Sequence, residues 1–147
     1  MGNEMRGIWL AVCLVLAPAQ AFAGAAETIK VQKPWFRYLL PSVPAGGYMV
    51  LVNKSDTPTA LTKASSPDCS SLMLHKSMNM GGTAMMVPVD SVPVPANGQA
   101  ELVEGGYHLM CMNPKMKLGQ PAVITLTFKD GSSLILSVPV YGATNAP

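Results

Sequence analysis

Residues 122–140 read AVITLTFKDGSSLILSVPV and carry the clearest structural signal in the chain. They contain two short apolar segments, Ala122–Phe128 and 133–140, separated by Lys129-Asp130-Gly131. An Asp-Gly pair between two such segments is a strong signal for a tight turn between antiparallel strands. This stretch therefore predicts a β-hairpin.

The side-chain pattern of these two strands indicates how each is buried. In the first, Ile124, Leu126 and Phe128 alternate with other residues, and residues two apart in a strand point to the same face. In 133–140 the apolar residues fall on both faces, which is typical of a central strand. We expect the first strand to turn one face to a core and the second to lie inside the sheet.

The rest of the chain repeats this organisation. Thirteen glycines and thirteen prolines recur along it and argue against long helices. Turn signals separate further short, β-rich apolar segments at residues 28–32, 47–53, 60–64, 72–76, 85–88, 99–103 and 107–112. Many short strands with almost no helical pattern predict an all-β fold, an antiparallel Greek-key β-sandwich, with residues 24–147 as one domain.

The N-terminal residues 1–23 have the pattern of a secretory signal peptide. Arg6 precedes an apolar run at residues 8–17, and Ala21-Phe22-Ala23 provides a small-x-small cleavage site. The run is about half the roughly 20 residues needed to span a bilayer. Cys13 could suggest a lipoprotein, but Val12 stands where a small residue is needed. We therefore expect an exported protein without stable membrane insertion.

Charge and motif content exclude several classes of function. Ten Lys and Arg against eight Asp and Glu give a net charge of +2 without runs of one sign. This distribution indicates no nucleic-acid partner. No nucleophile–base pair and no Cys-x-x-Cys motif is visible, so we do not expect an enzyme. Nothing in the pattern suggests an obligate interface, so we expect a monomer.

Methionine and histidine are concentrated in one part of the chain. Seven of the eleven methionines lie between Met73 and Met112, together with both histidines, His75 and His108. His108 and Met110 are two apart in a predicted strand, so they should project from the same face. Thioether sulfur is a soft donor that favours Cu(I). The pair therefore indicates a copper site.

The spacing of these residues resembles a known signature. Ten residues separate His75 from Met86, twenty-one separate Met86 from His108, and one separates His108 from Met110. This is similar to the His-x10-Met-x21-His-x-Met motif of the periplasmic PCuAC-type copper chaperones. Further segments that resemble that family are PWFR (34–37), GGYM (46–49), ASSP (64–67), GGYHLM (105–110) and LTF (126–128).

The resemblance implies a cupredoxin-like β-sandwich in the periplasm. It implies that His75, Met86, His108 and Met110 bind one Cu(I) per monomer near the surface. It also implies delivery of that ion to the copper site of a terminal oxidase subunit, directly or together with a thiol-bearing copper chaperone. The chain ends without the His- and Met-rich tail of some relatives, so one well-defined site is expected.

Several residues near this motif keep more than one interpretation. Cys69 and Cys111 either form a disulfide, stay as free buried thiols, or involve Cys111 in copper transfer, although alternation points Cys111 away from His108. Four further methionines either have only a structural role or form a soft outer shell around the ion: Met78, Met80, Met85 and Met112. Residues 78–84 show no strand pattern and are expected to be a mobile loop without copper.

Two other functions remain open at this stage. An electron-transfer cupredoxin needs a Cys thiolate, two His and a weak Met, but no histidine follows Cys111. A β-sandwich that binds another protein and no metal would use the methionines as an apolar docking face. Trp35 and Tyr48 are interpreted as core aromatics.

Overall fold

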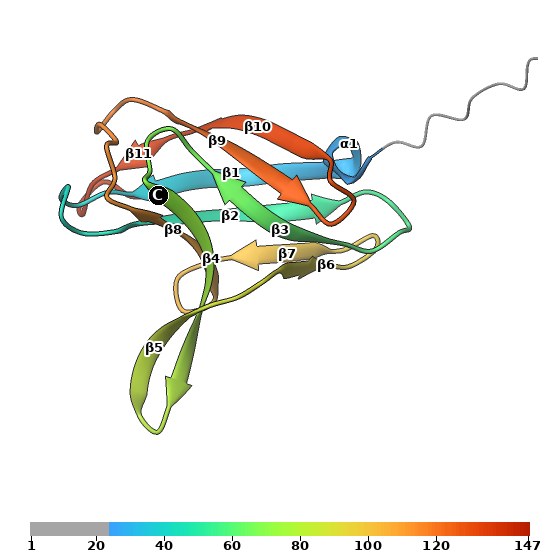
Figure 1. The fold of residues 1–147 in the computed structure, drawn as a ribbon, viewed down its shortest axis with the longest axis horizontal. Coiled ribbons are helices and arrows are strands. Elements are labelled where there is room, and N and C mark those ends of the chain that lie inside the picture. The colour runs from blue at the N-terminus through green and yellow to red at the C-terminus, as the bar shows by residue number, and fades with distance from the viewer. Residues whose placement is uncertain (1–23) are drawn as a thin grey trace, which may run out of the picture.

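A computed structural model describes residues 24–147. The predicted signal peptide, residues 1–23, lies outside the described residues. The elements are α1 (Ala25–Thr28), β1 (Ile29–Arg37), β2 (Ala45–Asn53), β3 (Thr59–Ser65), β4 (Ser71–Met80), β5 (Thr83–Pro88), β6 (Val92–Val94), β7 (Gln99–Leu102), β8 (Tyr107–Met112), β9 (Ala122–Phe128), β10 (Ser133–Val138) and β11 (Val140–Tyr141) (Figure 1).

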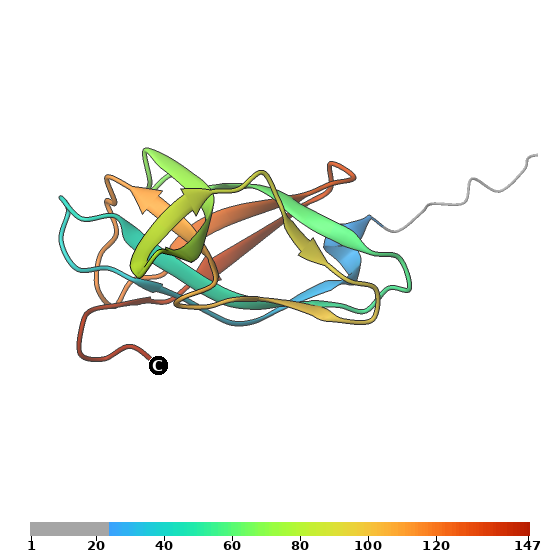
Figure 2. The same ribbon diagram turned by 90° about the horizontal axis from the view of Figure 1, so that it is seen from below.

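The strands form one hydrogen-bonded path that folds over on itself. Its order is β10-β9-β3-β4-β8-β7-β2-β1-β11, with β5 added to β4 and β6 added to β3. Figure 2 shows the two resulting layers, with β9 and β10 on one side and β1 and β2 on the other. Most pairings are antiparallel, but β1–β11 and β7–β8 are parallel. The all-β sandwich expected from the sequence is confirmed, with this small parallel component.

The core lies between the two layers. Ile124, Leu126 and Phe128 of β9 are all buried, so the alternation in this strand is confirmed. They pack in one cluster with side chains such as Phe36 of β1 and Leu51 of β2. Burial of one such large apolar side chain contributes roughly 1.5–3 kcal/mol. Within β2, Gly47 is needed for close approach, because a Cβ there would lie 2.6 Å from the Phe36 ring.

The strand predicted at 133–140 differs from expectation. It breaks before Pro139 into β10 and β11, and β11 leaves β9 to pair with β1. β10 pairs with β9 alone and ends the path, so it is an edge strand rather than a central one. Its apolar Ile135 is exposed. A run of apolar residues on both faces does not distinguish an edge strand from a central one.

Two further differences arise at prolines. β1 continues past the predicted end at Gln32 through a bulge, where Lys33 has φ +48° and Pro34 follows. The bulge gives the proline, which has no N–H, a place in the strand. The short strand β6 was not predicted, because Pro93 interrupts it. Both flanking valines are buried, and β6 pairs only with β3 at the edge.

Residues 78–84 form a regular β-hairpin rather than an irregular loop. β4 runs on to Met80, and its residues 75–80 pair with the whole of β5. The turn consists of Gly81 and Gly82, both with positive φ, which suits a two-residue hairpin. Asn79 Oδ1 accepts a hydrogen bond from the Gly82 amide at 3.1 Å. β4 and β5 therefore project from the body as a two-stranded arm (Figure 1).

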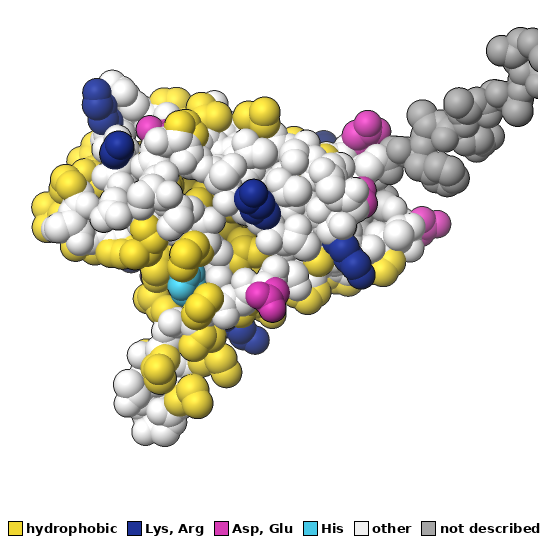
Figure 3. All heavy atoms as spheres, viewed as in Figure 1, with side chains coloured by type: hydrophobic (Ala, Val, Ile, Leu, Met, Phe, Trp, Pro, Cys, Tyr) yellow, Lys and Arg dark blue, Asp and Glu magenta, His cyan; other side chains and the backbone are white. Residues whose placement is uncertain are grey.

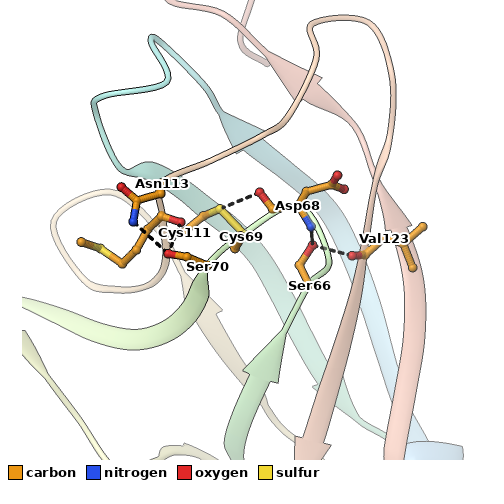
Figure 4. Close-up of a disulfide and its surroundings, with 8 residues drawn as sticks. Ser66, Asp68, Cys69, Ser70, Cys111, Asn113 and Val123 are labelled. Carbon is orange, nitrogen blue, oxygen red and sulfur yellow. Dashed lines mark hydrogen bonds between the residues drawn. A yellow bond between two sulfur atoms is a disulfide. The ribbon is translucent and has the colours of Figure 1, made fainter.

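Cys69 and Cys111 are joined by a disulfide, so the free-thiol interpretation is wrong. The bond connects the β3–β4 turn to β8 (Figure 4). Ser70 strengthens the connection, since its amide and its hydroxyl both donate to the Met112 carbonyl, at 2.9 and 3.0 Å. The C-terminal half of β8 is thus tied to the start of β4.

Candidate metal centre

Strand register brings the predicted ligands together. His75 of β4 lies directly opposite His108 of β8, and Met73 lies opposite Met110. Opposite residues of an antiparallel pair share one face of the sheet. On the arm, Met86 pairs with Ser77, two residues from His75. All four predicted ligands therefore lie on one face of the β5-β4-β8 sheet.

The two histidines are the buried polar groups of this site. Their exposed fractions are 5% for His75 and 4% for His108, and their rings stack with centroids 5.9 Å apart. His108 Nδ1 lies 3.1 Å from the Gly106 carbonyl oxygen. A carbonyl only accepts, so in the neutral ring Nδ1 carries the proton and Nε2 keeps a free lone pair.

One nitrogen of each ring has no hydrogen-bond partner although it is buried: His75 Nδ1 and His108 Nε2. Such orphaned groups are uncommon in proteins and call for an explanation. A bound metal ion would provide the missing partner, since neutral imidazole nitrogen is a common metal ligand. The donor set of two imidazoles and two thioethers fits a soft ion such as Cu(I).

A hollow of about 290 Å³ opens beside the His108 ring. It is lined by three of the predicted ligands, Met86, His108 and Met110, together with Tyr48 and Arg37. The remaining lining residues are Leu39, Val43, Pro44, Ala45 and Gly46. Met86 is the most accessible of the four predicted ligands, with 61% of its surface exposed. The site is thus anchored by buried histidines and open on the methionine side.

Tyr48 and Trp35 support this hollow rather than the core, so the core interpretation of both is wrong. Their rings are half-buried and pack at 4.8 Å between centroids, and the Tyr48 ring lies 6.5 Å from that of His108. Burial, together with the charge of Glu104, raises the pKa of Tyr48. Gly46 makes room for the tyrosine, because a Cβ there would lie 2.5 Å from its hydroxyl.

The methionines outside the motif fall into separate groups. Met49 and Met116 are buried in the core. Met73 shares the ligand face, which the spacing motif alone did not reveal. Three others lie on the opposite face of the arm and do not form an outer shell for this site: Met78, Met80 and Met85.

Burial lowers the pKa of His75 below its ordinary value of 6.5, and the charge of neighbouring His108 lowers it further. A hydrogen bond with the Met73 backbone opposes this shift. His75 is therefore neutral, the form that binds metal, at neutral pH. Below pH 6.5 the His75 side chain takes up a proton more readily in the unfolded state than in the folded state.

The sign of this linkage predicts that the copper-free protein loses stability as pH falls through 6.5 toward the lower pKa of His75. We expect a smaller free energy of unfolding in urea at about pH 5.5 than at about pH 7.5. The difference should shrink in His75→Gln. A His75 imidazole NMR titration with its midpoint at or above 6.5 would contradict this prediction.

The structure removes the ligand that an electron-transfer cupredoxin requires. Cys69 and Cys111 are bonded to each other, and Cys111 is buried on the core side of β8. Within residues 24–147 no three His, Cys, Asp or Glu side chains gather to hold a metal. In the same part of the chain, no helix has the length and apolar character to cross a bilayer.

Comparison with known proteins assigns the chain to a family and agrees with the fold. Residues 29–140 match the family described as "Putative lipoprotein LpqE-like". The "Putative lipoprotein Lxx21020" of Leifsonia xyli subsp. xyli is 32% identical over 139 residues, covering 91% of this chain and 83% of the relative.

Solved structures of PCuAC and related proteins share the fold. The copper-bound PCuAC domain from PmoF2 has a TM-score of 0.67 and 26% identity, and the match covers 82% of this chain and 97% of that domain. The solution structure of CuI-DR1885 from Deinococcus radiodurans has a TM-score of 0.59 and 33% identity, with 80% of each chain covered. The chain therefore belongs to the LpqE-like family and has the fold of the PCuAC domains.

Proposed function

We propose that the protein is a periplasmic copper chaperone, not an enzyme. It binds one Cu(I) through His75, Met86, His108 and Met110 and delivers the ion to the copper site of a terminal oxidase. The observation that carries this proposal is the pair of buried, partnerless imidazole nitrogens on the face that also holds the two motif methionines. The copper in the related PmoF2 domain and in CuI-DR1885 supports it.

The donor set suits both retention and release of Cu(I). Two imidazoles and two thioethers are neutral, so the bound ion keeps its single positive charge. Thioethers need no deprotonation and, unlike thiolates, do not form disulfides in an oxidising compartment. The buried histidines orient the ion, whereas Met86 lies on the exposed arm and can be replaced by a ligand from an acceptor. An accessible thioether is therefore the exit point of the copper.

The rim of the hollow fits a protein acceptor. Leu39 and Val43 are exposed beside it on the β1–β2 loop. Such apolar residues next to a metal site would contact an oxidase subunit or a thiol-bearing copper chaperone during transfer. The alternative of a non-metal interaction surface uses the same side chains but requires no copper affinity.

Transfer is tested by mixing the Cu(I)-loaded protein, without oxygen, with the copper-free soluble domain of a terminal oxidase subunit. After separation by size, we expect copper to be found on the acceptor when the two proteins are mixed, but to move much more slowly when a dialysis membrane keeps the proteins apart. Met112→Leu, on the ligand strand but outside the motif, should transfer normally. Movement of copper only through free solution would contradict direct delivery.

Export with cleavage after Ala23 is the second part of this proposal. The LpqE-like family and the Leifsonia relative are both described as lipoproteins, whereas here Val12 precedes Cys13. Intact-mass analysis of the exported protein should give a chain that begins at Gly24. A lipid-modified chain that begins at Cys13 would show that the protein is membrane-anchored instead.

A further inference from the structure

The β4–β5 arm has a second face that the four-ligand site does not use. Met78 pairs directly with Met85 across the arm, and Met80 is two residues from Met78, so these three side chains share one face. Met86, the next residue after Met85, points to the other face. The arm thus separates two groups of thioethers that lie back to back.

These three methionines are not used in packing. The exposed fractions are 43% for Met78, 57% for Met80 and 46% for Met85. None belongs to the hydrophobic core, and Figure 3 shows hydrophobic side chains gathered on the projecting arm. Isolated exposed apolar residues are normal, but three thioethers on one face of a short hairpin need a separate reason.

Their spacing allows the three sulfur atoms to meet. Directly opposite residues in an antiparallel pair have Cβ atoms roughly 4.5–5.5 Å apart, and diagonal neighbours lie about 7–8 Å apart. Methionine has three rotatable bonds and adapts its shape easily. The charged residue on this face, Lys76, has its ammonium 4.9 Å from the Tyr107 ring centroid at the base of the arm.

The geometry points to a second Cu(I) site, formed by the thioethers of Met78, Met80 and Met85 on the outer face of the arm. Three neutral soft donors select Cu(I) over harder ions. The site has one donor fewer than the four-ligand site and no buried imidazole, so it fills second. It rests on the proposed function only for this order of filling. The protein then holds two ions, one on each face of the arm.

The test is an anaerobic Cu(I) titration of protein labelled with ¹³C at the methionine methyl groups. We expect the first equivalent to shift the methyl signals of Met86 and Met110, and the second to shift those of Met78, Met80 and Met85 together. The variant Met78→Leu/Met80→Leu/Met85→Leu keeps the apolar volume but loses the sulfur. It should bind one equivalent instead of two, whereas Met116→Leu, a core control, should still bind two.

A second variant separates this proposal from the four-ligand site. In Met86→Leu/His108→Asn the three arm signals should still shift with Cu(I), at the first equivalent. If they shift there and the Met86 and Met110 signals of the wild type never shift, only the proposed four-ligand site is wrong. If the arm signals do not move in any titration, or move singly, or the triple leucine variant still binds two ions, the second site is overturned.

Discussion

Replacing His108 by alanine is expected to lower the Cu(I) affinity of the protein by at least about 100-fold. Loss of a group that only orients a metal ligand typically costs about 10- to 100-fold, and His108 is assigned as a ligand itself. Its ring is already oriented, because Nδ1 is held by the Gly106 carbonyl at 3.1 Å while Nε2 has no partner. Competition with a Cu(I) chelator under anaerobic conditions measures the change.

The control for this variant is a second substitution in β8. Met112→Leu alters a methionine of the same strand outside the motif and should leave the affinity of the first ion within about twofold, well below the 1.4 kcal/mol of a tenfold change. Because His108 is buried and stacked on His75, thermal unfolding of the copper-free variant must show that it is folded. A folded His108→Ala protein with wild-type affinity would remove the four-ligand assignment.

Removing the disulfide is expected to have the largest effect on stability. Cys69 and Cys111 are 42 residues apart, and closing a loop of that length restricts the unfolded chain by about 4 kcal/mol in the chain-entropy description. We therefore expect Cys69→Ala/Cys111→Ala to lose about 4 kcal/mol of unfolding free energy in urea, measured without copper.

The disulfide is also expected to support the metal site. Cys111 follows Met110 directly, and the bond holds this end of β8 against the start of β4, where Ser70 donates two hydrogen bonds to the Met112 carbonyl. Wild-type protein treated with a reductant should approach the stability of the double variant. A loss below about 1 kcal/mol in both would indicate that the native contacts alone hold these strands.

The pattern of individual strands was predictable because it is local. The alternation in β9 and the Asp-Gly turn after it were both confirmed. The predictions were wrong where one local sequence signal is compatible with two different structures. The first strand was expected to end at Gln32, but a bulge carries β1 past Pro34 to Arg37. Residues 78–84 were expected to be a loop, but Gly81 and Gly82 form the tight turn of the β4–β5 arm.

The proposed ligands were identified from their spacing in the sequence, but their arrangement in space could not be predicted from it. Alternation alone placed His108 and Met110 on one face, because side-chain direction in a strand repeats every two residues. That His75 lies opposite His108, and that Met86 shares their face while Met78, Met80 and Met85 do not, depends on the register of β4 with β8 and β5.

The amino-acid sequence by itself therefore determined the all-β class and the hairpin of β9 and β10, and its resemblance to the PCuAC-type chaperones gave the four residues proposed to bind copper. Only the tertiary structure decided the disulfide, the edge position of β10, the half-buried aromatics and the two faces of the arm. The physical reason is range: turn chemistry and alternation act over a few residues, whereas register and distance depend on contacts between strands far apart in the chain.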